Sequence, residues 1–313
     1  MKSRGKVLEL AVAPVITEER RTTRRTISRR RFLGLTAALG AAVLAGDSLL
    51  LEPNRPQLVR QELALPRWPA ALDGYKIAVL SDFHYDPVFS VHPLRAAIPV
   101  VNGLRPDLIA LTGDFVTHAS FGGNRRKAAY AAEPCASFLR QMKAPHGLWA
   151  VMGNHDAITD PKLVTSILQS TGIRVLDNQS TPVEHAGARF WLSGVDDVLK
   201  GNSDLNAALA NVPKGEPTIL LAHEPDYADF VARYPVDLQL SGHSHGGQVR
   251  LPFLPPFYEP PLAQKYIAGL FRVGPLTLYT NRGIGTIGLP IRFDCPPEIT
   301  LLTLRQGTTL SGA

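Results

Sequence analysis

The chain alternates short apolar runs with segments in which apolar residues recur at helical spacing. The runs are five or six residues long and lie between turn residues, a pattern that predicts buried strands. Strands are predicted at 75–80, 107–112, 147–152, 190–195, 218–222 and 236–240, and helices at 92–104, 128–142, 161–170 and 226–232. Strands that alternate with helices in this way predict a layered α/β architecture.

The N-terminal segment has a different pattern, in which a basic head precedes an apolar stretch. The head ends in Ser28-Arg-Arg-Arg-Phe-Leu, and residues 35–45 are rich in Ala, Leu and Gly. This layout is typical of a signal peptide. The Ser-Arg-Arg-x-Phe-Leu string resembles the twin-arginine export motif, so we expect the twin-arginine export machinery as a partner and a periplasmic or cell-envelope location. An ordinary helix with a basic cap is the alternative, and residues 35–45 alone are too few to span a bilayer.

The boundaries of the predicted segments follow from composition. Residues 1–50 form the signal segment, residues 51–70 are rich in Pro, Arg and Leu and are expected to be a linker or an irregular lead-in strand, and residues 71–313 form the folded domain. Leu49–Leu51 extends the apolar stretch, and no A-x-A cleavage site follows it. An uncleaved N-terminus that associates the protein with the membrane therefore remains open.

Charge is distributed unevenly along the 313 residues. The net charge of +6 invites a nucleic-acid interpretation, but 10 of the 33 basic and 3 of the 27 acidic residues lie in residues 1–31. The remainder therefore carries 23 basic and 24 acidic residues. Non-specific binding to nucleic acid depends on Lys and Arg that neutralise phosphates, so the sequence gives no support for a nucleic-acid partner.

The chain has only two cysteines, Cys135 and Cys295, which are far apart in the sequence and form no C-x-x-C motif. They are poor candidates for a metal pair. An exported protein could join them in a disulfide, but two free thiols are the favoured interpretation.

Candidate metal ligands follow the predicted strands. Five strings are involved: Asp82-Phe-His84, Gly113-Asp114, Gly153-Asn154-His155-Asp156, His223, and Gly242-His243-Ser-His245. Loops that leave neighbouring strands converge at one edge of an α/β sheet, so these strings are expected to meet. Carboxylate and amide oxygens beside neutral imidazoles suit divalent ions, and a carboxylate between two ions can bridge them. The strings therefore predict a two-metal hydrolytic centre.

The strings differ in specificity. Gly242-His-Ser-His245 is the strongest, since its imidazoles lie on one side and glycine lets the backbone approach an ion closely. Asp82-Phe-His84 and Gly113-Asp114 are each also ordinary turn chemistry, and a single His223 is more often structural. The order and the strand-end placement of all five strings carry the prediction.

In that order the strings resemble the calcineurin-like metallophosphoesterase superfamily over residues 76–245. The later Asn281-Arg-Gly-Ile-Gly-Thr-Ile-Gly string and Cys295-Pro-Pro-Glu-Ile resemble its exported (twin-arginine) bacterial phosphodiesterase branch. The resemblance implies a catalytic domain over residues 71–313 with a sandwich of two mixed β-sheets flanked by helices. It implies two divalent metal ions, for which Mn, Fe and Zn all suit the ligands. By this resemblance, the first ion is bound by Asp82, His84 and His245, and the second ion by Asn154, His223 and His243. Asp114 bridges the two ions, and His155 is an acid that does not bind metal.

One departure from the family pattern narrows the activity. Members that are serine/threonine protein phosphatases usually continue Gly-Asp-x-x-Asp-Arg, but this chain reads Gly113-Asp-Phe-Val-Thr-His118. Protein phosphatase activity is therefore disfavoured. Arg282 and Arg292 are candidates for the missing phosphate-binding cation, with the ordering of a loop as the alternative role. Asp196-Asp197 is expected to be a turn, with contact to a ligand as the alternative.

The resemblance implies a dinuclear metal-dependent phosphoester hydrolase, a phosphodiesterase that uses a metal-bridging hydroxide. An alternative is a hydrolase of envelope lipid or nucleotide-sugar-lipid pyrophosphates, and a second is a catalytically idle metal-binding envelope protein. Residues 251–262 are rich in proline and carry Leu, Phe and Tyr next to the strongest string. They are expected to form either a stiff loop packed on the core or the wall of a pocket for a lipid-linked phosphoester.

Overall fold

The computed structural model describes residues 27–118 and 123–307. Contacts between segments divide the chain into two units, Met1–Val43 and Leu44–Ala313. The described part of the first unit forms most of helix α1 (Arg29–Gly46). The second unit therefore begins well before residue 71, and includes the segment that was expected to be a linker.

Helical structure continues beyond α1 through two short turns, Asp47–Leu51 and Glu52–Asn54. The whole stretch Arg29–Asn54 is 26 residues long, and its length and composition suit a membrane-spanning helix or a signal sequence. Residues 35–45 alone are too few to span a bilayer. The longer helix makes either role physically possible.

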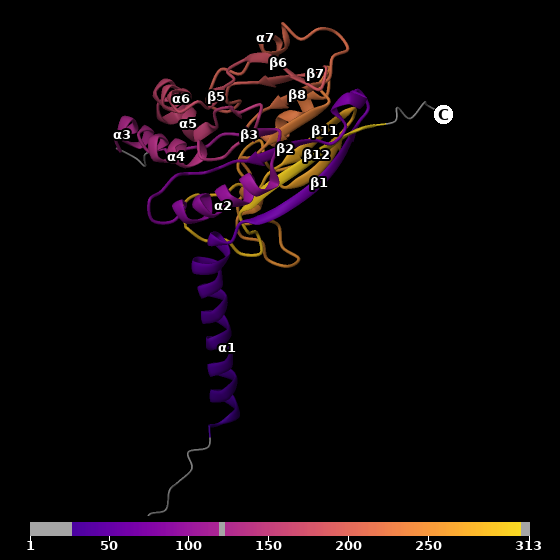
Figure 1. Ribbon diagram of the computed structural model, residues 1–313. Coiled ribbons are helices and arrows are strands. Elements are labelled where there is room, and N and C mark those ends of the chain that lie inside the picture. Colours follow the sequence, from indigo (N-terminus) through magenta and orange to yellow (C-terminus); the bar gives the residue numbers. More distant parts are fainter. Residues whose placement is uncertain (1–26, 119–122, 308–313) are drawn as a thin grey trace, which may run out of the picture. The chain divides into compact units, whose positions relative to one another are not determined.

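Two six-stranded sheets make up the centre of the second unit (Figure 1). The first sheet has the order β1-β12-β2-β3-β4-β5, and only β12 runs antiparallel to β2. Its strands are β1 (Gln57–Leu65), β2 (Tyr75–Leu80), β3 (Leu108–Leu111), β4 (Leu148–Ala150), β5 (Arg174–Val175) and β12 (Glu298–Gln306). Pairing of both kinds makes this a mixed sheet.

The second sheet has the order β10-β11-β9-β8-β7-β6, with antiparallel pairing at its two edges and parallel pairing in its centre. Its strands are β6 (Gln179–His185), β7 (Ala188–Gly194), β8 (Thr218–Leu221), β9 (Leu238–Ser241), β10 (Gly269–Val273) and β11 (Leu276–Thr280). The predicted α/β sandwich of two mixed sheets is thus confirmed.

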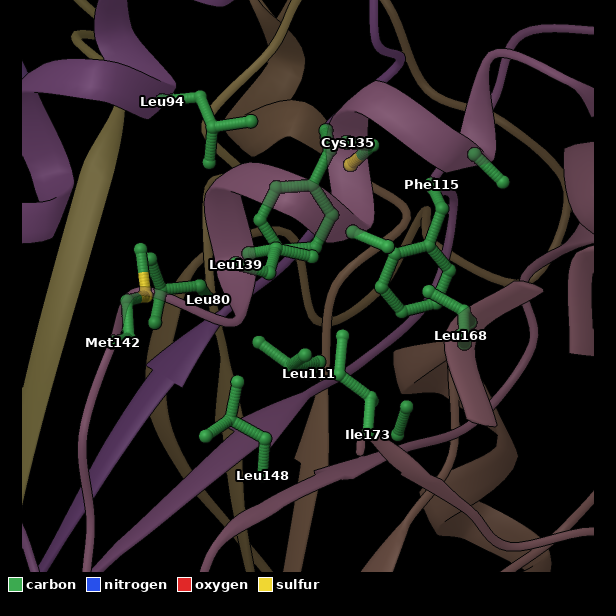
Figure 2. Close-up of a cluster of buried hydrophobic side chains, with 14 of the residues drawn as sticks. Leu80, Leu94, Leu111, Phe115, Cys135, Leu139, Met142, Leu148, Leu168 and Ile173 are labelled. Atoms are coloured by element: carbon green, nitrogen blue, oxygen red, sulfur yellow. The ribbon is translucent and has the colours of Figure 1, made fainter. Parts of the chain in front are cut away.

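Helices cover the outer faces of the sandwich. The helices are α2 (Val91–Leu104), α3 (Arg125–Ala129), α4 (Ala132–Leu139), α5 (Asn154–Thr159), α6 (Pro161–Ser170), α7 (Leu205–Leu209) and α8 (Ala228–Val231). Figure 2 shows how Leu139 and Cys135 of α4 lie with Leu80 and Leu111 of the first sheet in one buried cluster. The central strands are buried along their length, so each sheet buries both faces, one against helices and one against the other sheet.

The core between the sheets is formed by side chains that point inward from both. Ile77 and Ala110 of the first sheet meet Phe190 and Leu240 of the second in one cluster. Trp68 packs at 5.1 Å between ring centroids against Phe190, which closes this layer next to β1. A rigid sandwich of this kind holds the strand ends, and the loops that leave them, in fixed positions.

The sequence predicted several elements at their observed bounds. β2 and α6 match the predicted 75–80 and 161–170 residue for residue. The predicted helix 128–142 is instead two helices, α3 and α4, separated at Tyr130 and Ala131. Both cysteines are free and buried, as favoured from their number.

The segment from 51 to 70 differs from a linker. Residues 57–65 form a regular strand, β1, that pairs in parallel along its full length with β12. Its burial alternates only weakly, because it is an edge strand, and Leu63 and Leu65 are its buried side chains. That weak alternation hid the strand from the sequence pattern.

Candidate metal centre

Five loops bring the predicted ligands together. They follow β2, β3, β4, β8 and β9, which are the central, mostly parallel strands of both sheets. The seven residues predicted as metal ligands are Asp82, His84, Asp114, Asn154, His223, His243 and His245. Six of them fall into two groups whose potential ligand atoms lie within 4.8 Å of one another, and His155 forms a third such group with His84 and Asp114. The loops that leave the strands of the two sheets therefore bring their polar side chains together in one place.

The first group is Asp82, His84 and His245, all buried. Nε2 of His84 lies 3.0 Å from Nε2 of His245, and the latter atom lies 3.4 Å from Oδ1 of Asp82. The backbone N–H of His243 donates to Oδ2 of Asp82 at 2.9 Å, which fixes the carboxylate against the loop after β9. Two imidazole nitrogens and a carboxylate oxygen thus point at one small volume.

The second group is Asp114, His223 and His243, also buried. Oδ2 of Asp114 lies 3.3 Å from Nε2 of His223 and 3.4 Å from Nε2 of His84, which belongs to the first group. Asp114 therefore lies between the two groups, where the sequence placed a bridging ligand. Asn154 begins α5 beside this group, with its Oδ1 buried and without a hydrogen-bond partner.

Hydrogen bonds outside the groups fix which imidazole nitrogen is available to an ion. Nδ1 of His223 pairs with the carbonyl oxygen of Thr112 at 2.6 Å, and Nε2 of His243 pairs with that of Pro261 at 2.9 Å. Since a carbonyl only accepts, each of these nitrogens carries the proton. In its neutral form His223 would then offer Nε2, and His243 would offer Nδ1, as the unprotonated nitrogen that a metal ligand requires.

Burial sets the protonation of the site. Burial lowers the pKa of His84, His243 and His245, that of His243 to about 4, so these imidazoles are neutral at physiological pH. Burial also opposes the charged form of His223, but the carboxylate of Asp114 outweighs it and raises the pKa of His223 well above its ordinary value. The same pairing holds the pKa of Asp114 low despite its burial. The buried carboxylate of Asp114 is therefore stabilised by positive charge close to it.

The donor set fits divalent metal ions. Asn154 Oδ1, His223 Nε2 and His245 Nδ1 are buried polar atoms without a hydrogen-bond partner, and such atoms are rare in folded proteins. Oxygen and imidazole donors of this kind suit Mn, Fe and Zn. The residues present therefore fit the group of ions that the sequence predicted.

The backbone at the site is strained. Asp82, His84, Asp114, His243 and His245 all have positive φ, between 40° and 67°. Residues with a Cβ adopt this region uncommonly, and such residues cluster at functional sites because the strain is compensated by the surrounding fold. Five of the seven predicted ligands thus adopt a backbone conformation that the strands themselves would not impose.

Glycine lets the loops approach one another. A Cβ on Gly113, at φ +99°, would lie 2.7 Å from both the backbone N of Gly153 and Nδ1 of His223. Cβ atoms do not approach backbone atoms this closely, so only glycine fits. The glycines of the sequence strings therefore have a steric role in assembling the centre.

His155 lies at the rim of the two groups and contacts His118. The backbone N–H of His118 donates to Nδ1 of His155 at 3.2 Å, and Nδ1 of the His118 ring lies 2.7 Å from the same atom. Because Nδ1 of His155 accepts, the proton of the neutral ring lies on Nε2. A protonated nitrogen does not bind a metal, and it can donate a proton to a substrate atom.

Comparison with known proteins agrees with this geometry. The sequence model of the calcineurin-like phosphoesterase family matches residues 75–247, which include every predicted ligand. The chain belongs to the calcineurin-like phosphoesterase family. Its members bind divalent metals, and the activity of this chain is that of a metal-dependent phosphoester hydrolase.

Three relatives illustrate the range of the family. The uncharacterized metallophosphoesterase YkuE of Bacillus subtilis is 35% identical, with 90% of this chain and 98% of the relative covered. The phosphodiesterase YaeI of Escherichia coli is also 35% identical, with 89% and 99% covered. The UDP-2,3-diacylglucosamine pyrophosphatase LpxG of Chlamydia muridarum is 28% identical, with 87% and 97% covered. The likeness extends well beyond the calcineurin-like phosphoesterase motifs, over almost the whole length of each relative.

The structure assigns contacts to two residues without a role in the sequence analysis. His118 stands where phosphatases of the family carry arginine, and it contacts His155 instead. Asp156 accepts hydrogen bonds from the backbone N–H groups of Phe115, Val116 and Gly153. It ties the loop after β3 to the loop after β4, and both loops carry ligands.

Tyr258 is a third residue that sequence reasoning missed. Its ring lies 6.1 Å from that of His245, and burial together with the charges of Asp114 and Asp82 raises its pKa to about 12. It belongs to the proline-rich stretch 251–262, in which the alternation of apolar and proline residues gave no sign of a side chain directed at the centre. Its hydroxyl is a neutral donor at physiological pH.

The two arginines considered for phosphate binding have other partners. Arg292 is fully buried and donates to the carbonyl oxygens of Arg282, Gly285 and Cys295. Arg282 forms an ion pair with Glu298. The structure therefore favours the alternative role, the ordering of the loop after β11.

Asp196 and Asp197 form the expected turn. Asp196 accepts from the backbone N–H groups of Asp197 and Asn202, and Asp197 accepts from that of Lys200. Glu224, the residue after His223, accepts from the backbone N–H of Val198, and burial beside Asp197 raises its pKa well above the ordinary value. The turn thus lies behind a ligand and supports the loop that carries it.

Proposed function

We propose that this protein is a dinuclear phosphodiesterase of the cell envelope, with lipid-linked phosphodiesters or pyrophosphates as its substrates. The position of Asp114 carries the proposal. Its carboxylate lies within 3.4 Å of an imidazole nitrogen from each group, so one side chain is shared by two sets of donors. A shared carboxylate is the feature that distinguishes a two-ion centre from two separate sites.

The proposed ligands are Asp82, His84 and His245 for one ion and Asn154, His223 and His243 for the other, with Asp114 between them. Two divalent ions, when bound, supply an activated water and offset the charge of the phosphoryl oxygens. His155 is the proposed general acid: its Nε2 gives a proton from the imidazolium form to the leaving alkoxide or phosphate, and the ring returns to neutral. His118 holds that ring by Nδ1.

The substrate class follows from the surroundings of the centre. Arg282 and Arg292, the candidate phosphate cations, are engaged elsewhere, so the dianionic charge of a phosphomonoester gains nothing from them. A phosphodiester carries one negative charge less than a phosphomonoester, so it depends less on such a cation. The names of two relatives, a phosphodiesterase and a pyrophosphatase of a diacylated nucleotide sugar, support the same class.

The location rests on the N-terminal sequence. Ser28-Arg-Arg-Arg-Phe-Leu and the 26-residue stretch Arg29–Asn54 support export by the twin-arginine machinery, followed by retention at the membrane. Mn²⁺ is the ion to test first, since it suits oxygen and imidazole donors together.

The deciding experiment is hydrolysis of bis(p-nitrophenyl) phosphate by the full chain with added Mn²⁺. We expect turnover by the unaltered chain and a loss of more than about 100-fold in Asp114→Asn, since even partners outside a metal's ligands are worth 10–100-fold. Elemental analysis should find two ions per chain in the first case and fewer in the variant. Undiminished turnover in Asp114→Asn would show that the centre is wrongly assigned.

A panel of substrates separates the remaining alternatives. A diacylated nucleotide-sugar pyrophosphate, a glycerophosphodiester and a phosphopeptide should be compared at equal concentration. Preference for the first supports the pyrophosphatase alternative, and preference for the phosphopeptide would contradict the proposal. An idle metal-binding protein would retain both ions and hydrolyse none of the three.

A further inference from the structure

Several large apolar side chains of the catalytic unit are exposed to solvent. They belong to four segments: the turn after α1, the loop before α2, the proline-rich loop 251–262 and the loop after β11. We call six of them the apolar rim: Leu50, Val88, Phe89, Phe253, Phe257 and Leu289, with exposed fractions from 51% to 105%. Contiguous exposed apolar surface marks a site of interaction with a protein or a membrane.

Neighbouring cavities connect the apolar rim to the metal centre. A cavity of about 280 Å³ is lined by the ligand His84 together with Phe89, Thr286 and Pro290. A second, of about 210 Å³, shares Phe89, Thr286 and Pro290 with the first and adds Leu50. The rim and the ligand therefore belong to one connected depression.

A third cavity extends the depression on the other side. It has about 260 Å³, shares Gly288 with the cavity at His84, and is lined by Phe257, Tyr258, Leu289 and Ile291. Tyr258 also faces His245, as described above. An apolar chain that lies in this cavity would have its polar end at the metal centre.

The helical N-terminal stretch attaches to the body beside these cavities. The backbone N–H of Arg292 donates to the carbonyl oxygen of Ser48 at 3.0 Å, and that of Asp294 donates to the carboxylate of Glu52 at 3.0 Å. Leu49 and Leu50 line the 210 Å³ cavity. The carboxyl end of the possible membrane span, Arg29–Asn54, is thus fixed to the loop that also carries Leu289.

The proline-rich loop presents Phe253 and Phe257 outward although exposed apolar rings are unfavourable in water. Phe253 is fully exposed and has a φ of 65°, which is rare for a bulky residue. The loop is held at its far end by the hydrogen bond between His243 and Pro261. The loop after β11 lies beside the loop before α2, since Thr286 and Pro290 line one cavity with Val88.

The geometry points to a membrane-contacting surface: the apolar rim dips into the phospholipid bilayer, so that a lipid-linked substrate moves from the bilayer through the depression to the metal centre. The argument for lipid is the continuity of the rim with the end of the possible span. Leu50 lies four residues before the end of the possible span, Arg29–Asn54, and the rim residues Val88 and Phe89 line the same cavity as Leu50. This inference rests on the proposed envelope location, and names the surface that meets the substrate.

The first test reads membrane contact without enzyme activity. The full chain is reconstituted in phosphatidylethanolamine–phosphatidylglycerol vesicles with brominated acyl chains, and tryptophan is introduced as Phe253→Trp or, as a matched exposed control on α8, Phe230→Trp. The three natural tryptophans give the background. We expect at least twofold stronger quenching of the added fluorescence for Phe253→Trp. Equal quenching of both variants would overturn the inference, and so would a dimer with position 253 shielded from lipid.

The second test separates membrane contact from chemistry. Phe253→Asn removes the exposed ring, and asparagine tolerates the positive φ, so the fold is kept. We expect turnover of bis(p-nitrophenyl) phosphate to stay unchanged and turnover of a vesicle-embedded lipid phosphodiester to fall at least fivefold. Leu270→Ser on β10 is the control, with both activities kept. Equal rates of the vesicle substrate for Phe253→Asn and the unaltered chain would contradict the inference, whereas absence of all hydrolysis would count only against the proposed function.

Discussion

Nδ1 of His118 lies 2.7 Å from Nδ1 of His155, and the backbone N–H of His118 donates to the same atom. One residue thus holds the imidazole by both its ring and its backbone. Phosphatases of the family were expected to use a carboxylate and an arginine in this stretch, and this chain has Thr117 and His118. The proposed acid, His155, is therefore oriented by a second histidine.

The contact predicts a dependence on the leaving group. His118→Ala removes the ring but keeps the backbone donor. We therefore expect kcat to fall about tenfold with an alkyl leaving group, which is less than the usual effect of losing a general acid. Loss with p-nitrophenol should be small, because this leaving group departs without a proton. The measurement is kcat for both diesters, with His185→Ala as a control away from the site. Equal losses for the two leaving groups would exclude a role through His155.

The close contact between the loops after β3 and β4 predicts that one added methyl group will weaken metal binding. Gly113→Ala adds a Cβ 2.7 Å from Gly153 and His223, whereas Gly172→Ala adds one in open space at a similar φ of +88°. Both variants incur the backbone strain of a left-handed residue, about 1–3 kcal/mol. Only Gly113→Ala should also lose metal affinity.

Urea unfolding and metal titration measure the two effects in parallel. If both variants lose stability equally and retain the same affinity for Mn²⁺, the loops after β3 and β4 are not in the close contact described. A larger loss in Gly113→Ala would give the steric part of the cost by difference.

The buried guanidinium of Arg292 predicts a structural effect. Arg292→Lys cannot satisfy the carbonyls of Arg282, Gly285 and Cys295 together, because it loses the planar fork of donors. We expect a loss of about 3 kcal/mol in unfolding free energy, as for a broken buried polar contact. Arg189→Lys, in an exposed pair with Glu216, should change it by less than about 0.5 kcal/mol.

The same variant tests the phosphate-binding alternative. A structural role leaves the KM for a soluble diester within twofold of the unaltered value at temperatures where the protein is folded. A KM that rises more than tenfold with unchanged stability would return Arg292 to the substrate site.

How much of the fold and of the candidate site could be predicted from the sequence depends on which interaction places each residue. β2 and α6 were predicted at their observed bounds because burial alone sets their apolar patterns. β1 was expected only as an irregular lead-in strand, the alternative to a linker, because an edge strand alternates weakly and its partner β12 lies more than 230 residues away. Long-range pairing leaves no periodic signal in the local sequence.

For the candidate metal centre, the sequence indicated which polar side chains the structure brings together, because each of them follows the end of a strand. The positive φ values of five of these residues could not be predicted, because the surrounding fold imposes them. Tyr258 was missed because no pattern in a proline-rich loop tells which aromatic ring turns inward. The roles of Arg282 and Arg292 depend on partners that only the structure identifies.

Removal of metal predicts a change in stability. Ions that bind only the folded chain stabilise it by mass action, about 2.7 kcal/mol at 100 times the dissociation constant. In a domain of this size that corresponds to roughly 5–10 °C in Tm. Chelation by EDTA should therefore lower the Tm of the full chain by this amount, and added Mn²⁺ should restore it. The Asp114→Asn variant should respond less, because it has lost the carboxylate that serves both groups. A shift of the same size in the variant and the unaltered chain would place the stabilising ions at some other site than the one between Asp82 and His223.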